Sequence, residues 1–338
     1  MKLTRYSKNP VISPNPNNDW ESLVTTNPAA WYNQDTREVI MLYRAAGNDA
    51  EHRIHLGLAT SNDGYTFTRM SDKPVVSPSS DGFDAGCLED PRIVKIGDWY
   101  YITYATRAFP PGQYWVKDGS SKYKRPVCPS EFPMALRENF TATGLMLTRD
   151  FKSFIRAGRL TDPLLDDRDV IIFPEKVNGK FITLHRPMQW KGAAYGTEHP
   201  AMWIAESDDL LEPKRMKLFA TGVAGWEKKI GGSTPPIKTK DGWLLLYHAV
   251  GDDKKYRIGA MLLDLADPSR IIARTKDWIY QPEADYETKG IYNGVVFPCG
   301  NVVIDGTLFV YYGGADIYGC VATADLDDLV AFVKSTPV

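Results

Sequence analysis

The stretch Gly242-Trp243-Leu244-Leu245-Leu246-Tyr247-His248 decides the fold, because similar aromatic and aliphatic runs recur along the chain. Four other runs also end in Tyr or His: Val39 to Tyr43, Trp99 to Tyr104, Phe181 to His185 and Leu308 to Tyr312. The five end residues, taken as Tyr43, Tyr104, His185, His248 and Tyr312, lie about 60 to 80 residues apart. Each run precedes a second apolar run, so paired strands in every repeat predict an all-β, five-bladed β-propeller whose loops meet on one axis.

The repeat extends almost from end to end, so we expect the 338 residues to form a single propeller domain, 1–338. With 43% hydrophobic residues the chain can build a large core. Beyond the last repeat, Leu326, Leu329, Val330 and Val333 have helical spacing. This spacing predicts a short C-terminal helix from Asp325 to Lys334.

The second repeat is lengthened by an insertion at residues 107–139, rich in proline, aromatic and basic side chains. Loops of this length in a compact domain are usually functional or disordered. The many aromatic residues favour an ordered lid or a contact between subunits of a homo-oligomer, and a solvated loop without a role is the alternative.

Composition and charge exclude several classes of protein. A net charge of -2 provides no basic surface for nucleic acid or for an anionic membrane. The chain has no apolar stretch of membrane-spanning length and no secretory signal at Met1, which predicts a cytoplasmic protein. The 4 cysteines lie far apart without a CxxC pair, so we expect reduced thiols and no metal site.

A candidate catalytic acid lies in the stretch Leu88-Glu89-Asp90-Pro91-Arg92, directly before the apolar run from Ile93 to Ile96. Proline fixes the turn and leaves the preceding residue extended, which points a carboxylate toward the propeller axis. A sheltered carboxyl group can have a raised pKa and act as a general acid.

Candidate anion-binding residues follow in the third repeat. Arg168 precedes an apolar run and Arg186 follows the next one, so a hairpin would bring both guanidinium groups to one end. The alternative is that each arginine pairs with a neighbouring acid such as Asp166 or Asp169, the usual state of charged turns.

The fourth repeat adds cations of its own. Lys229 precedes the glycine turn Gly231-Gly232, and His248 ends the next apolar run. Two arginines, a lysine and a histidine that converge from adjacent blades would bind phosphate oxygens.

At these residues the chain resembles glycoside hydrolase family 130, a family of five-bladed propellers that includes β-mannoside phosphorylases and β-mannosidases. The resemblance covers almost the whole chain and rests on several phrases: Glu89-Asp90-Pro91-Arg92, Phe173 to Lys180, His185-Arg186-Pro187, Gly242 to His248, Gly259 to Leu265, Val296 to Cys299 and Tyr311 to Asp316. Such a family member would use Asp90 as its general acid. The resemblance assigns phosphate binding to Arg168, Arg186, Lys229, His248 and Tyr256, and mannose binding to Asn27, Arg53 and Asp316.

The chain departs from the family pattern at three places. Asp169 stands where an Asn is common, the glycine turn reads Gly231-Gly232-Ser233-Thr234-Pro235, and the insertion is long. The first departure adds a negative charge near the anion pocket. The last leaves the acceptor sugar open, and we expect Tyr114 and Trp115 to shape its subsite.

The resemblance implies inverting phosphorolysis of a β-1,2- or β-1,4-linked mannoside to α-mannose 1-phosphate, with inorganic phosphate as co-substrate and no cofactor. Asp90 would protonate the glycosidic oxygen, directly or through a mannose hydroxyl. One alternative is an inverting β-mannosidase that uses water, with Asp169 or Glu175 as the base. Another is a non-catalytic carbohydrate-binding propeller.

Overall fold

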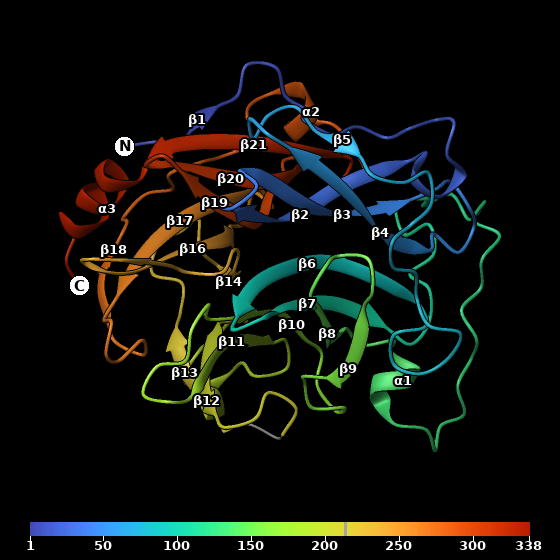
Figure 1. Ribbon diagram of the computed structural model, residues 1–338. Helices are drawn as coiled ribbons and strands as arrows, with labels where there is room; N and C mark the ends of the chain where they lie inside the picture. The colour runs from blue at the N-terminus through green and yellow to red at the C-terminus, as the bar shows by residue number, and fades with distance from the viewer. Residues whose placement is uncertain (213–214) are drawn as a thin grey trace.

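The computed structural model describes residues 1–212 and 215–338, and the strands within these ranges form five β-sheet blades (Figure 1). The first strands of successive blades, β2, β6, β10 and β14, contact one another in order, and β19 of the last blade contacts β2. Blade 4 contacts the last blade through β17 and β19, so the five blades close a ring. The predicted all-β five-bladed propeller is confirmed.

The first two blades belong to one hydrogen-bonded sheet, in which a single parallel bridge, Ile54 to Cys87, joins them. Blade 1 consists of β2 (Val24–Asn33), β3 (Glu38–Ala46), β4 (Ile54–Ser61) and β5 (Thr68–Arg69). Blade 2 consists of β6 (Cys87–Ile96), β7 (Trp99–Arg107), β8 (Ala142–Thr148) and β9 (Ile155–Arg159).

The remaining blades are separate antiparallel sheets. Blade 3 consists of β10 (Asp167–Ile172), β11 (Phe181–Pro187), β12 (Met202–Ser207) and β13 (Met216–Ala220). Blade 4 consists of β14 (Lys229–Gly232), β15 (Ile237–Thr239), β16 (Gly242–Val250), β17 (Tyr256–Leu263) and β18 (Ile271–Arg274). Blade 5 consists of β19 (Val296–Ile304), β20 (Thr307–Gly314), β21 (Tyr318–Asp325) and the N-terminal β1 (Thr4–Arg5).

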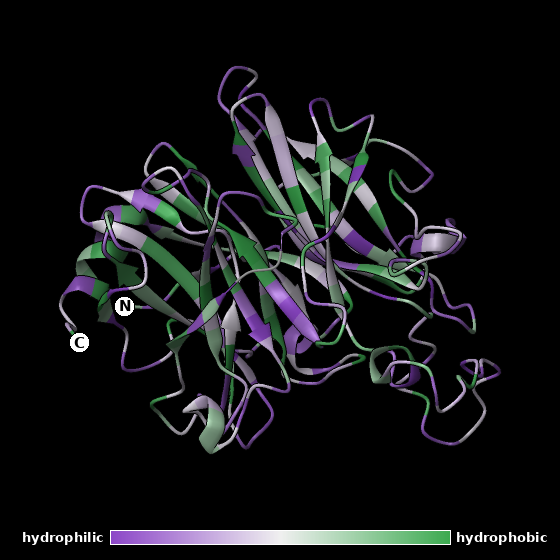
Figure 2. Cartoon of the chain, turned by 90° about the horizontal axis from the view of Figure 1, so that it is seen from below, coloured by the Kyte–Doolittle hydropathy of each residue, from purple (hydrophilic) through white to green (hydrophobic). Residues whose placement is uncertain are grey.

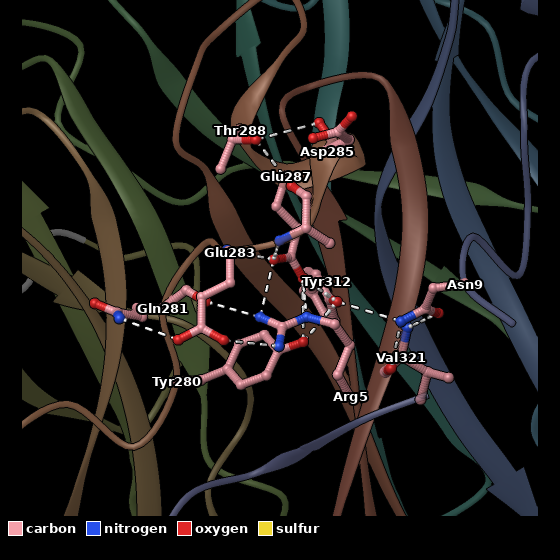
Figure 3. Close-up of polar contacts among 11 residues, drawn as sticks. Arg5, Asn9, Tyr280, Gln281, Glu283, Asp285, Glu287, Thr288, Tyr312 and Val321 are labelled. Carbon is pink, nitrogen blue, oxygen red and sulfur yellow. Dashed lines mark hydrogen bonds and ion pairs between the residues drawn. The ribbon is translucent and has the colours of Figure 1, made fainter. Parts of the chain in front are cut away.

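The N-terminal strand β1 closes the ring by pairing with β21, the third strand of blade 5 (Figure 1). Arg5 on β1 forms an ion pair with the buried Glu287, with Nε 2.9 Å from Oε1 (Figure 3). Tyr312 donates its hydroxyl to the same carboxylate at 2.7 Å. The Asn9 side chain donates to the Val321 carbonyl at 2.8 Å and accepts from the Val321 amide at 2.9 Å. Both ends of the chain are thereby fastened within one blade.

Short helices accompany the sheets: η1 (Asp19–Glu21), α1 (Met134–Arg137), η2 (Ala193–Tyr195), α2 (Asp285–Thr288) and α3 (Leu326–Lys334). The predicted C-terminal helix is α3, and Asp325 caps it by accepting a hydrogen bond from the Asp328 amide at 2.9 Å. The buried side chains Leu329, Val330 and Val333 pack against blades 4 and 5. Burial of this apolar stripe explains why the helix forms at the edge of the propeller.

Hydrophobic clusters fill the space between each pair of neighbouring blades, and Figure 2 shows the hydrophobic colour concentrated along the strands. The run in β16 illustrates the reason. Trp243 and Leu245 pack toward blade 3, whereas Leu244 and Leu246 pack toward blade 5. Successive side chains of a strand point to opposite faces, so a blade covered on both sides needs an uninterrupted apolar run.

The repeat register taken from the sequence is wrong by one residue in blade 4. Tyr43, Tyr104 and Tyr247 each lie opposite a glycine of the next strand, and a Cβ atom there would lie 2.2 to 2.3 Å from the tyrosine ring. Each of these tyrosines donates its hydroxyl to a buried carboxylate. Tyr247, not His248, is therefore the repeat residue.

The insertion, residues 107–139, is mostly irregular and contains α1 as its one helical turn among the described residues. Cys128 within it is half-buried, whereas Cys87, Cys299 and Cys320 are buried, and all of them are free thiols. Within residues 1–212 and 215–338, no helix has the length and apolar character needed to cross a membrane.

Candidate active site

All five blades and the insertion contribute to one polar pocket with a volume of about 560 Å³. Among its lining residues are Asn27, Arg44, Glu89, Asp90, Arg107, Tyr114, Tyr123, Arg125, Arg168, Asp169, Arg186, Tyr256, Tyr292, Phe297 and Asp316. The pocket thus brings together carboxylates and guanidinium groups that are far apart in sequence.

Irregularities in the first strands of three blades aim polar side chains at this pocket. Asn27, Asp90 and Asp169 have positive φ angles of 46°, 49° and 59°. Each lies where the pairing register of its strand shifts. Asn and Asp tolerate the left-handed conformation better than other side chains, and Pro28 and Pro91 follow two of them where no ladder donor is needed. The first strands of blades 1, 2 and 3 therefore share the same kind of bulge, with an Asn or Asp at the left-handed position.

The candidate acid Asp90 lies at the edge of the pocket, with 15% of its side chain exposed. Its Oδ1 accepts a hydrogen bond from the Asn27 side chain at 2.7 Å. The same oxygen accepts from Arg44 Nη1 at 3.1 Å. Two donors thus fix Oδ1 of a carboxylate that lines the pocket.

Arg44 is a charged pocket residue that was not expected from the sequence. It follows the repeat residue Tyr43 directly, as Arg186 follows His185 and His248 follows Tyr247. Because strand neighbours face opposite ways, the residue after each repeat tyrosine or histidine faces the side away from it. The position directly after the repeat residue was therefore a sequence signal for a pocket side chain. In blade 1 this side chain is Arg44, which lies beside the carboxylates of Glu89 and Asp90.

Arg44 balances two further carboxylates that line the pocket. Glu89 lies 3.4 Å from Arg44 Nη1 and 4.0 Å from Arg107 Nε. Burial favours the neutral acid, but these two cations lower the pKa of Glu89 to about 2. Burial, reinforced by the charges of Asp90 and Glu89 and opposed by Arg44, raises the pKa of Asp316 to about 6.

In the same pocket, Arg168 and Arg186 are directly paired across the strands β10 and β11, as the predicted hairpin requires. Asp166 holds Arg168, with Arg168 Nη2 2.7 Å from its carboxylate oxygens. Asp169 holds Arg186, with Oδ2 2.7 Å from Nη2. Both parts of the sequence interpretation therefore apply: the arginines converge, and each is paired with an acid.

The Asp169 carboxylate lies close to three cationic or polar side chains. Besides Arg186, its Oδ2 lies 3.3 Å from His248 Nε2, and its Oδ1 lies 3.6 Å from Arg92 Nη2. Burial alone would raise the pKa of Asp169, but Arg186 and His248 hold it far below its usual range. The group is an anchor for cations and stays ionised.

Lys229 lies outside the pocket lining, and its Nζ lies 3.3 Å from the hydroxyl of Tyr256, which lines the pocket. Burial, together with the charges of Arg186 and Arg168, lowers the pKa of Lys229 to about 7. Burial raises the pKa of Tyr256 to about 12. The lysine therefore gains or loses its proton in the neutral range.

His248 is fully buried behind Arg186, with its Nε2 3.4 Å from Arg186 Nη1. Its other ring nitrogen lies 3.3 Å from the Ser233 hydroxyl. Burial lowers the pKa of His248 to about 4, so the ring is neutral at pH 7. At that pH His248 orients Arg186 but carries no positive charge. The sequence had suggested four cations, of which His248 was one.

The two insertion residues expected to shape the acceptor subsite have different surroundings. Tyr114 lines the pocket, and burial and the negative charge of Asp316 raise the pKa of its phenol. Trp115 lies outside the pocket lining and packs edge-on against His52, with ring centroids 4.6 Å apart. Only Tyr114 of the pair contributes to the wall itself.

Arg53, expected to hold mannose, is not brought to this pocket. Its side chain is 46% exposed and forms an ion pair with Glu51. It lines a second cavity, which shares Pro110 and Tyr123 with the pocket. Arg44 is the arginine next to Asp90, because the strand β3 directs it inward.

A metal site was not expected from the sequence. In the part of the chain that the structure describes, no group of three or more His, Cys, Asp or Glu side chains is arranged to hold a metal ion.

A five-bladed propeller whose pocket contains a carboxylic acid and paired arginines fits a carbohydrate-active enzyme of the phosphorylase type. The chain belongs to glycoside hydrolase family 130: the profile of this family, described as β-1,4-mannooligosaccharide phosphorylase, matches residues 3–120 and 136–335.

Individual relatives support this assignment. The chain is 38% identical to the 1,2-β-oligomannan phosphorylase of Thermoanaerobacter sp. (strain X514), over 97% of this chain and 99% of that protein. It is 26% identical to the β-1,4-mannooligosaccharide phosphorylase of Ruminococcus albus, over 98% of this chain and 91% of that protein. The structure of the β-1,2-mannobiose phosphorylase from Listeria innocua in complex with β-1,2-mannobiose superposes with a TM-score of 0.77 at 27% identity, covering 99% of this chain and 100% of that one.

Proposed function

We propose that this protein catalyses the inverting phosphorolysis of β-mannosides, releasing α-mannose 1-phosphate and the acceptor sugar. The observation that carries the proposal is a single pocket that is lined both by Asp90 and by the pair Arg168 and Arg186. The phosphorylase relatives support the same reaction. Inorganic phosphate is the co-substrate, and the reaction needs no further cofactor.

In the proposed reaction Asp90 supplies the proton for the glycosidic oxygen, directly or through a mannose hydroxyl. The bond between the anomeric carbon and that oxygen breaks, and a phosphate oxygen bonds to the carbon from the opposite face. Arg168, Arg186 and Lys229 hold the phosphate, while His248 orients Arg186. Asn27, Asp316 and Arg44 surround the mannose at the cleaved position. A phosphate anion is already a nucleophile, so no general base is needed.

Direct hydrolysis by water would need a second carboxylate that accepts a proton. Asp169 is a poor base, because three partners hold its carboxylate and its pKa is far below the usual range. Glu175 lies outside the pocket lining, is 47% exposed and pairs with Lys238. These contacts favour phosphorolysis over the β-mannosidase alternative.

For the linkage, we propose β-1,2. The relative at 38% identity is named for β-1,2-oligomannan, and the one at 26% identity is named for β-1,4-mannooligosaccharides. Tyr114 and the rest of the insertion wall then face the acceptor sugar.

The test is the phosphate dependence of β-1,2-mannobiose cleavage, followed by detection of α-mannose 1-phosphate. Cleavage at the same rate in phosphate-free buffer, with release of free mannose, would refute phosphorolysis. Asp90→Asn should lower kcat by about 100-fold or more, the usual contribution of a general acid. Asp98→Asn, on the exposed turn between β6 and β7, is the matched control and should leave kcat unchanged. If sugar binds but no substrate turns over in the unaltered protein, the non-catalytic carbohydrate-binding propeller is the better description.

We further propose that residues 1–338 act as one catalytic unit in the cytoplasm, where the charged sugar phosphate is retained. A homo-oligomer is also part of the proposal. Exposed apolar side chains on the insertion, Val127 (95% exposed), Met134 (57%) and Phe132 (44%), support a subunit contact there. Sedimentation of the intact protein and of a variant with all three changed to serine would test it.

A further inference from the structure

A second cavity, which we call the outer cavity, lies next to the active-site pocket and has a volume of about 900 Å³. It is bounded by the insertion on one side and by residues 80–83 and 51–53 on the other. Pro110 and Tyr123 line both spaces, so one wall separates the two. The volume falls within the range of about 300 to 1,000 Å³ that is usual for small-molecule sites.

The wall between the two spaces is held in place by contacts with blade 1. The Gly112 amide donates to the Glu51 carbonyl at 2.9 Å, which fastens the insertion to the loop between β3 and β4. The Tyr123 ring packs on Gly112 so closely that a Cβ atom there would lie 2.8 Å from it. His52, buried in the same loop, contacts the rings of Tyr114 and Trp115. The wall is therefore built from two segments that fix each other.

The chemistry of the outer cavity suits a polyhydroxylated ligand. Phe83, Phe109 and Tyr123 supply flat apolar faces, and the ion pair of Glu51 and Arg53 supplies polar groups at its edge. The Tyr123 hydroxyl is buried and makes no hydrogen bond within the described residues. A buried hydroxyl without a partner is costly unless a ligand supplies one.

We propose that the outer cavity binds the distal sugar units of a longer mannan chain, beyond the acceptor unit that lies against the insertion wall. This inference rests on the proposed function and extends it to chain length. The mannose to be transferred lies beside Asp90, and the chain leaves the pocket past Tyr123 toward Phe83 and Arg53. The protein then prefers oligosaccharides of four or more units to the disaccharide.

The experiment compares kcat/KM for phosphorolysis of β-1,2-mannobiose and β-1,2-mannotetraose. In Phe83→Ala we expect the tetraose-to-biose ratio of kcat/KM to fall about fivefold, because only the longer chain reaches the ring. Arg53→Ala removes an exposed side chain whose ion-pair partner is Glu51, and it should lower the same ratio by about threefold. Tyr195→Ala, an aromatic residue 38% exposed on blade 3, is the matched control and should leave the ratio unchanged.

An unaltered ratio in both folded variants, or equal losses for both substrates, would overturn the outer-cavity proposal. A wild-type ratio of one would overturn it as well. If the wild-type protein cleaves neither substrate, the proposed function fails, and calorimetric binding of mannotetraose still tests the cavity. In that case affinity should drop about fivefold in Phe83→Ala, and equal affinities would reject the site.

Discussion

Lys229→Arg should remove the pH dependence that the wild-type lysine gives to phosphate binding. Lys229 is buried beside Arg168 and Arg186, and this environment lowers its pKa from 10.5 to about 7. The amine is cationic below that pH and neutral above it. An arginine at the same position stays charged throughout the neutral range.

The magnitude follows from this pKa. About half of the lysine is protonated at pH 7 and about a tenth at pH 8, so the KM for phosphate should rise about fivefold over that interval through this group alone. Phosphate itself also titrates near neutral pH, but it does so equally with both proteins. The wild-type KM divided by the Lys229→Arg KM therefore isolates the lysine.

The assay measures initial rates of α-mannose 1-phosphate release at several phosphate concentrations from pH 6.5 to 8.5. A KM ratio that stays constant across this range would refute the titration of Lys229. Should the arginine variant be inactive, the rise in melting temperature caused by phosphate provides the second readout. It should fall with increasing pH in the wild type more steeply than in the variant. The pH dependence of folding stability without phosphate should be opposite to that of phosphate binding. The contribution of Lys229 to the free energy of unfolding increases as pH rises from 7 toward 10.5, because the unfolded chain binds more protons than the folded chain in this range.

Two further predictions concern the fold. Glu287→Gln leaves Arg5 without its buried carboxylate partner and should lower the free energy of unfolding by about 3 kcal/mol in urea titrations. Glu283→Gln is the control: it changes the 60% exposed partner of the same arginine and should lower the free energy of unfolding by less than about 1 kcal/mol. Equal losses in the two variants would contradict the stabilising role of the buried Arg5–Glu287 ion pair. Gly57→Ala places a Cβ atom 2.2 Å from a repeat tyrosine ring and should destabilise by about 1 to 3 kcal/mol. Gly225→Ala is the control, because there is open space around Gly225. If Gly57→Ala leaves the free energy of unfolding unchanged, the tyrosine ring can move aside and the reasoning is refuted.

Much of the architecture could be predicted from the sequence because its causes are local. Apolar runs such as Trp243 to Leu246 are buried on both faces, and the turns between them recur at a regular interval. The C-terminal helix was also predictable, since its apolar spacing and the cap Asp325 lie within a few residues of each other. The register error at His248 arose because both it and Tyr247 end the same run, and only the opposing Gly259 distinguishes them.

The site was predictable in part. Asp90, Arg168 and Arg186 line the pocket as expected, because the charged positions beside the apolar runs lie near the axis, although Asp90 lies at a bulge within β6 and not in a turn. Arg44 was missed because its one sequence signal, the position directly after the repeat residue Tyr43, was not used. Arg53 was misplaced because its side chain turns toward Glu51 on the surface.

The sequence by itself determined the five blades, their order along the chain and the charged residues beside the strands. These features follow from the sequence because they depend on residues that are close together in the chain and on the alternation of side chains along a strand. Only the tertiary structure decided which charges meet. Asn27 and Asp90 lie 2.7 Å apart in space although they belong to different blades. The proton affinities of Lys229 and Asp316 likewise depend on burial and on charges from distant blades, which sequence distance does not encode.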